Sequence, residues 1–190
     1  NQIDSVKLFI GIQSYNATLH QFVVESRKVM KDLIGWQTNG IAFYKQNVLA
    51  GIGSDNVRSI YSNHEIFHVL AMNLWGVPEV WINEGMAVYS SKQWHGYDLY
   101  QLTKYLIDNN RYVALDILIK KFRQVDDLVS YPLSGSFSKY LDKTYGRETV
   151  INIWQGKIRD IKVYTGKSIN ELEQDWLNEI STVEYFGIDY

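Results

Sequence analysis

The sequence predicts an α+β fold, with a small N-terminal mixed sheet and a helix packed on it, an active-site helix, and a mainly helical C-terminal part. Short apolar runs bounded by glycine and polar residues occupy the first part of the chain, and helical spacing of apolar residues follows Pro78. The 190 residues, of which 46% are hydrophobic, suit one globular domain. We therefore expect a single domain over residues 1–190, with its α+β part at about 1–56 and its helical part at about 57–190.

Three features are predicted in the N-terminal region. The apolar run Val6–Ile12 is typical of a strand. Apolar residues at positions 19–34 recur at helical spacings, which predicts a helix that ends at Gly35. The segment Gly40–Gly53 has two apolar runs separated by three polar residues, which indicates a hairpin. We expect its second run, Val48–Gly53, to be an exposed edge strand.

A longer helix is predicted after Asn56, and Gly76 and Pro78 end it. The rest of the chain is predicted to be helical. The expected segments are Val80–Lys92, Leu99–Asp108, Leu115–Val125, Ser134–Tyr145, Arg147–Gln155 and Ser168–Ile180. The last segment is the best marked, because Ser168 and Glu171 have the spacing of a capping box.

Composition excludes several classes of function. The net charge of -2 gives no basic field of the kind that attracts nucleic acid, so no nucleic-acid partner is expected. No apolar run reaches the roughly 18 residues of a transmembrane helix. The absence of cysteine leaves His, Asp and Glu to hold any metal ion. We expect a monomer, and the start at Asn1 in place of Met favours a processed chain that is secreted or lies in the cell envelope.

The segment from His64 to His68, HEIFH, has the pattern HExxH. On a helix, residues four apart share one face, so both imidazoles can bind one ion while Glu65 lies beside them. Two histidines leave a tetrahedral zinc ion in need of one more protein ligand and an open position for water. Chance would produce this pattern on the order of once in a few hundred such chains. A buried structural histidine pair is the alternative, but Glu65 would then need a buried partner.

A third ligand is available in residues 81–87, WINEGMA, on the helix predicted after Pro78. The loop that contains Gly76 and Pro78 can reverse the chain and bring Glu84 to the histidines. A glutamate in the first turn of a helix is more often a partner of the helix dipole. The HExxH pattern upstream favours the ligand interpretation for Glu84.

HEIFH followed by WINEGMA resembles the gluzincin metallopeptidases and, more narrowly, the small peptidase-MA-like domains of that superfamily. In these proteins HExxH precedes a helix with a third glutamate ligand in a W-x-N-E-G-x-A type segment. The segments Tyr131–Leu141 and Thr165–Trp176 also look like the tail of the family. The resemblance implies a zinc metallopeptidase, a hydrolase whose substrate is a polypeptide.

The resemblance also implies roles for individual residues. One zinc ion per chain would be bound by His64, His68 and Glu84, with Glu65 as the catalytic base that polarises the attacking water. Tyr131 is at the position similar to the family's tyrosine, which stabilises the oxyanion of the tetrahedral intermediate.

Two other assignments compete with this role for Tyr131. A tyrosine before a proline at a helix start is commonly a packing residue, and His95 is an alternative donor to the oxyanion. His95 itself lies in a polar segment, where an exposed loop histidine is the simpler interpretation. His20 has no partner at ligand spacing and is expected to be structural or solvated.

Residues 49–56, LAGIGSDN, depart from the gluzincin aminopeptidases, which have a glutamate before HExxH that binds the free amino group of the substrate. Asp55 is the acid that could replace it. We therefore expect an endopeptidase whose extended substrate pairs with the strand Val48–Gly53. Two alternatives stay open, namely a catalytically inactive peptidase-like binding module, against which the intact Glu65 and ligands count, and a zinc hydrolase of a non-peptide amide or ester.

Overall fold

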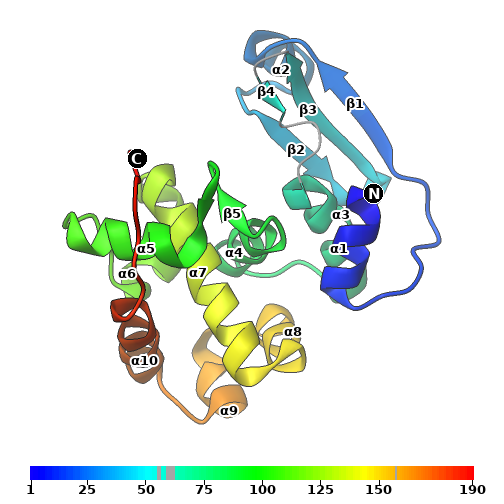
Figure 1. Cartoon of the computed structure of the whole chain (residues 1–190). Coiled ribbons are helices and arrows are strands. Elements are labelled where there is room, and N and C mark those ends of the chain that lie inside the picture. Colours follow the sequence, from blue (N-terminus) through cyan, green and yellow to red (C-terminus); the bar gives the residue numbers. More distant parts are fainter. Residues whose placement is uncertain (55–56, 59–62, 157) are drawn as a thin grey trace. The chain divides into compact units, whose positions relative to one another are not determined.

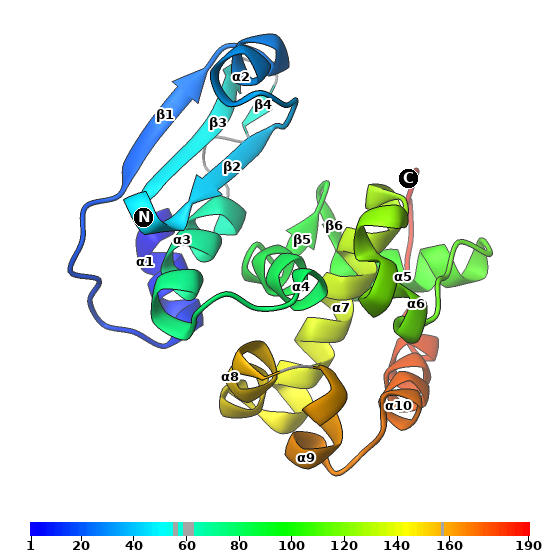
Figure 2. The same ribbon diagram turned by 180° about the vertical axis from the view of Figure 1, so that it is seen from behind.

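The computed structural model describes residues 1–54, 57–58, 63–156 and 158–190. The chain divides into two compact units, residues 1–76 and 77–190 (Figures 1 and 2). The predicted α+β class is confirmed, because the first unit contains a small mixed sheet and the second is mainly helical. Among the described residues, no helix has the length and apolar character needed to cross a lipid bilayer.

In its described residues, the first unit contains a sheet and three α-helices (Figure 1). In chain order its elements are α1 (Gln2–Ile10), β1 (His20–Val24), α2 (Arg27–Ile34), β2 (Gly40–Phe43), the 3₁₀ helix η1 (Tyr44–Gln46), β3 (Val48–Ser54), β4 (Val57–Arg58) and α3 (Asn63–Trp75). Strand β3 is central, because β1 pairs with it in parallel and β2 pairs with it in antiparallel fashion. Strand β4 pairs with the end of β3, also in antiparallel fashion.

The predicted hairpin at Gly40–Gly53 is confirmed, but the prediction that Val48–Gly53 is an edge strand was wrong. Val48–Ile52 pairs with β1, and residues 48–51 also pair with β2. The backbone N–H of Ile52 donates to the carbonyl of Asn39 at 3.0 Å, so the ladder continues beyond β2. The error has a clear cause, since β1, the strand that covers this edge, was expected to be helical.

Two N-terminal elements differ from the sequence prediction. Val6–Ile12 was expected to be a strand, but α1 covers most of it because Asn1 and Asp4 form a capping box and start the helix. The helix expected over residues 19–34 is divided into β1 and the shorter α2. Ser26 caps α2 by accepting a hydrogen bond from the N–H of Val29, and Gly35 ends it as predicted.

The sheet positions the HExxH helix. Helix α2 contributes Met30 to an apolar cluster with Val24, Ala50 and Ile52. Helix α1 packs on α3, where the rings of Phe9 and Phe67 lie 5.8 Å apart. Residues 66–71 of α3 are buried, so α3 is held firmly within the first unit.

The second unit is built around α4 and the long helix α7 (Figures 1 and 2). In chain order its elements are α4 (Val80–Ser90), β5 (Gln93–Trp94), β6 (Tyr97–Asp98), α5 (Leu99–Asp108), α6 (Leu115–Lys121), the 3₁₀ helix η3 (Phe122–Gln124), α7 (Asp127–Tyr145), α8 (Arg147–Gln155), the 3₁₀ helix η4 (Ile158–Asp160), α9 (Ile161–Thr165) and α10 (Ile169–Ser181). The predicted bounds of α5 and α8 are confirmed. The capping box of Ser168 and Glu171 at the start of α10 is also confirmed.

Other parts of this unit differ from the prediction. A short hairpin of β5 and β6 interrupts the expected helical run, with His95 and Gly96 at positive φ in its turn. Residues 115–125 form α6 and η3 in place of one helix. Helix α7 begins seven residues before the predicted Ser134, because Asp126 caps it and the helix continues through Pro132.

Pro132 leaves one carbonyl of α7 without its usual helical hydrogen bond. It has no N–H, so the carbonyl of Leu128, four residues earlier, lacks its usual helical donor. The hydroxyl of Tyr190 donates to this carbonyl at 2.8 Å. The same hydroxyl accepts a hydrogen bond from Nε1 of Trp94 at 2.8 Å. The C-terminal segment thereby stabilises the first turns of α7.

Helices α4 and α7 approach each other closely because small residues line their contact. A Cβ built at Gly85 would lie 2.5 Å from Oγ of Ser138 and 2.6 Å from the carbonyl oxygen of Ser134. On α7, a Cβ at Gly135 would lie 2.6 Å from Cγ1 of Val88. Both glycines are therefore required by the packing of the two helices.

Candidate metal centre

The two histidines of the HExxH segment lie on one face of α3, as their spacing predicts. The ring centroids of His64 and His68 are 4.6 Å apart. His68 is buried, with 7% of its surface exposed, and His64 is half-buried. Ile66 and Phe67, which lie between them in the sequence, are buried.

Glu84 lies on α4, in the second unit. Only 6% of its surface is exposed, which is unusual for a glutamate and requires compensating partners. Its neighbour Gly85 allows α4 to pack against Ser134 and Ser138 of α7. Trp81, one turn before, is also anchored, because its carbonyl accepts a hydrogen bond from Oγ of Ser134. The position of Glu84 is thus determined by helix packing.

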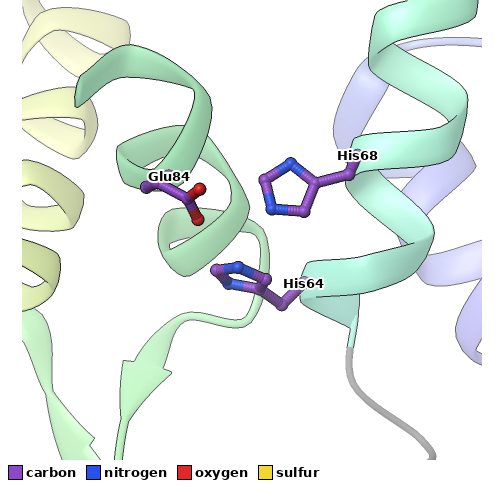
Figure 3. Close-up of side chains that lie close together, drawn as sticks. All are labelled: His64, His68 and Glu84. Atoms are coloured by element: carbon purple, nitrogen blue, oxygen red, sulfur yellow. The ribbon is translucent and has the colours of Figure 1, made fainter. Parts of the chain in front are cut away.

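His64, His68 and Glu84 form one group whose potential ligand atoms all lie within 4.8 Å of one another. Figure 3 shows the carboxylate of Glu84 directed toward the two imidazole rings. Two imidazole nitrogens and one carboxylate oxygen are a donor set that suits transition metals, zinc among them. The group could therefore hold a metal ion, as the sequence predicted.

Glu65, the predicted base, is half-buried on α3 and lies next to the start of β2. A Cβ built at Gly40 would lie 2.5 Å from Oε1 of Glu65 and 3.1 Å from its Cδ. The missing side chain at Gly40 therefore provides the space in which the carboxylate lies. Glu65 was predicted from the sequence, whereas its neighbour Gly40 was not.

Arg123 of η3 is a further residue of this region that the sequence analysis missed. Its Nη2 donates to Oε1 of Glu84 at 3.0 Å, and its Nη1 donates to the hydroxyl oxygen of Tyr131 at 3.2 Å. Partial burial acts to lower the pKa of Arg123, but the Glu84 carboxylate and Tyr131 act in the opposite direction, and the pKa is raised overall. No spacing or motif around Arg123 distinguishes it in the sequence from any surface arginine.

Tyr131 lies on α7 and is connected to Glu84 through Arg123. Its ring stacks on Trp94 with centroids 4.9 Å apart, and Phe122 contacts it edge-on at 5.3 Å. Burial raises the pKa of Tyr131 to about 12, and the charge of Glu84 adds to this increase. The phenol therefore stays neutral near pH 7 and can donate a hydrogen bond.

The other candidates named from the sequence lie elsewhere. His95 is exposed in the turn of the β5–β6 hairpin, where its ring is 4.8 Å from that of Trp94. His20 is exposed at the start of β1. Asp55 lies outside the described residues. Of the two candidate oxyanion donors, Tyr131 is therefore the one that the structure connects to Glu84.

Comparison of the chain with models of known protein families, with curated proteins and with solved structures gave no match.

Proposed function

We propose that the chain is a zinc-dependent peptidase that hydrolyses internal bonds of extended polypeptides. The observation that carries this proposal is the group of His64, His68 and Glu84, with ligand atoms within 4.8 Å of one another and Glu65 beside the first histidine. HExxH with a third glutamate is the ligand set of zinc hydrolases that attack carbonyl carbon with water.

Each residue has a role that follows from its position. His64, His68 and Glu84 would hold the zinc ion, which when bound acidifies a coordinated water and polarises the carbonyl to be attacked. Glu65 would accept the proton of the attacking water, and the space beside Gly40 lets its carboxylate lie there. Tyr131 would donate a hydrogen bond from its hydroxyl to the oxyanion that develops on the substrate.

The outer edge of β2 supports an extended substrate. Gly40 pairs with Gly51, so Asn39 is opposite Ile52. The N–H of Ile52 donates to the carbonyl of Asn39. Because backbone groups alternate in direction along a strand, the N–H and C=O groups of the odd-numbered residues of β2 face β3. The backbone N–H and C=O of Ala42 therefore face away from β3. Among the described strands, β2 pairs with β3 alone. A peptide added at this edge would lie beside Glu65, because Gly40 is in the same strand.

The proposal is tested by metal analysis and a cleavage assay on the same preparations. Protein purified without chelator should contain close to one zinc ion per chain, and His64→Ala, His68→Ala and Glu84→Ala should each lose it. Glu65→Gln should keep the zinc and lose nearly all cleavage of a peptide library, since an amide cannot accept the proton. Unchanged zinc in all three ligand variants would show that the site is assigned wrongly.

The Glu65→Gln variant also separates the peptidase from the two alternatives. An inactive binding module would bind peptides equally well in wild type and variant, with no cleavage by either. A hydrolase of non-peptide substrates would leave the peptide library intact and cleave simple esters or amides in a manner that requires Glu65. Either result would overturn the peptidase proposal while the metal site stands.

A further inference from the structure

Arg123 forms two hydrogen bonds, one to a candidate metal ligand and one to the candidate oxyanion donor. Nη2 donates to Oε1 of Glu84, and Nη1 donates to the hydroxyl oxygen of Tyr131. A guanidinium has no acceptor, so in the second contact the tyrosine oxygen accepts. The hydroxyl proton of Tyr131 is therefore not used by Arg123.

The contact with Glu84 joins a buried anion to a cation that faces solvent. The side chain of Glu84 is 8% exposed and that of Arg123 is 62% exposed. Helix α4 holds Glu84 in place through the close packing at Gly85, so Arg123 is not needed to orient it. Arg123 places its positive charge beside one of the two carboxylate oxygens of Glu84.

We propose that Arg123 is a positioning residue of this site, which shares the Glu84 carboxylate with the metal ion and polarises the Tyr131 hydroxyl toward the substrate oxyanion. This inference rests on the proposed peptidase function. It assigns to Arg123 an action through Glu84 and Tyr131, without contact to the reacting atoms.

Two physical effects follow from this arrangement. A guanidinium and a divalent cation on the same carboxylate repel each other, so Arg123 weakens metal binding. A donor to the oxygen of a hydroxyl strengthens the hydrogen bond that the hydroxyl itself donates, so Arg123 makes Tyr131 a better oxyanion donor. Loss of Arg123 should therefore tighten metal binding and slow turnover. A purely structural arginine would change the two quantities in the same direction or leave both unchanged.

The test compares Arg123→Met, which keeps an unbranched apolar stem and removes the charge, with Arg123→Lys, which keeps the charge. Zinc affinity is measured by competition with a chromophoric chelator, and kcat and KM are measured with a cleaved peptide. In Arg123→Met the zinc Kd should fall about tenfold, the scale expected for a univalent and a divalent cation a few ångströms apart in water-like screening. Its kcat should fall about tenfold or more with KM little changed. Arg123→Lys should keep a zinc Kd near that of wild type and recover part of the turnover.

Two controls separate this role from general effects of charge. Lys121→Met removes an exposed cation two residues away and should leave the zinc Kd unchanged. In a Tyr131→Phe background, Arg123→Met should lower kcat much less than it does in wild type, since the group that it polarises is absent. Equal losses in the two backgrounds would overturn the role through Tyr131.

The outcomes for Arg123 and for the peptidase are distinguishable. An unchanged or weaker zinc affinity in Arg123→Met overturns the role through Glu84, whatever the activity. If wild type binds zinc and cleaves no peptide, the peptidase proposal fails, the role of Arg123 on Tyr131 fails with it, and the affinity comparison still decides its role on Glu84.

Discussion

Gly40 leaves the space that the carboxylate of Glu65 occupies, since a Cβ at position 40 would lie 2.5 Å from Glu65 Oε1. The first prediction follows from this contact. Gly40→Ala should lower kcat about 10- to 100-fold, because the methyl group displaces the end of the Glu65 side chain. Zinc content should stay at the wild-type value, since α3 itself need not move.

Ala42→Gly is the matched control for this prediction, because residue 42 lies on the same face of β2 and the change removes a methyl group there. It should weaken the strand slightly and leave turnover near wild type. A Gly40→Ala variant with wild-type kcat would show that Glu65 is not the base in this position.

The second prediction concerns substrate pairing with β2. Ala42→Pro removes an N–H that faces away from β3, so it should lower cleavage of extended peptides while zinc is retained. Ile41→Pro removes an N–H that faces β3 and should disrupt the sheet, which circular dichroism and thermal unfolding would detect. Peptides with acetylated and free N-termini should be cleaved about equally. Strict dependence on a free amino terminus would contradict the endopeptidase proposal.

The third prediction concerns the packing that holds Glu84. Gly85→Ala should destabilise the protein by about 1–3 kcal/mol, because the new methyl group meets the backbone of Ser134 as well as the side chain of Ser138. Zinc affinity should also fall, since α4 must move away from α7. Denaturant unfolding and zinc titration measure the two effects.

Ser138→Ala tests the same contact from α7. Its buried hydroxyl has no hydrogen-bond partner among the residues that the structure describes, so the substitution should cost little stability by itself. In the Gly85→Ala background it should restore part of the lost stability, because it removes the clash with the Ser138 hydroxyl. The recovery should be incomplete, because the clash with the Ser134 carbonyl remains. Full additivity of the two changes would contradict the proposed contact.

The fourth prediction concerns the hydrogen bond from Tyr190 to the Leu128 carbonyl, which replaces the donor that Pro132 lacks. Tyr190→Phe removes the donor to the Leu128 carbonyl and should cost about 1–2 kcal/mol of unfolding free energy. Pro132→Ala restores a helical N–H for the same carbonyl, so Tyr190→Phe should cost less in that background. A double-mutant cycle by denaturant unfolding checks this, and a coupling energy of zero would show that the tyrosine does not replace the helical donor.

The fifth prediction concerns alkaline pH. Burial is the largest cause that raises the pKa of Tyr89, Tyr131 and Tyr190, each to about 12. The folded state holds these protons more tightly than the unfolded state, in which tyrosine titrates near pH 10. Stability should therefore be at its full value below pH 10 and decrease as pH rises from 10 through 12. Unfolding free energies and tyrosinate absorbance over this range test the sign, and constant stability up to pH 12 would contradict it.

The candidate site was predicted from sequence to the extent that it depends on helical spacing. His64 and His68 share a face because they are four residues apart, and this follows from the period of any α-helix. Glu84 was identified from its segment and from the need for a third ligand. Helix ends were also predictable where a capping residue marks them, as at Gly35 and Ser168.

The N-terminal elements were not predictable from local pattern in this way. The apolar residues Phe22 and Val23 fit a helical spacing with their neighbours, and together with Val24 they also suit a strand, so local pattern does not separate the two. The strand forms because β3 offers it a partner. Its formation makes β3 central and leaves β1 and β2 as the outer strands, of which β2 contains Gly40, the neighbour of Glu65.

The sequence by itself therefore determined that the two histidines share one helix face and where several helices begin or end, because these features depend on residues within a turn or two of one another. Glu84 was predicted from the pattern of its own segment. The tertiary structure alone decided that Gly40 lies against Glu65 and that Arg123 bonds both Glu84 and Tyr131. Arg123 lies 8 positions from Tyr131 and 39 positions from Glu84 in the sequence. Gly40 and Glu65 are 25 positions apart. No local period or propensity encodes them, because they exist only once the strands have paired and the helices have packed.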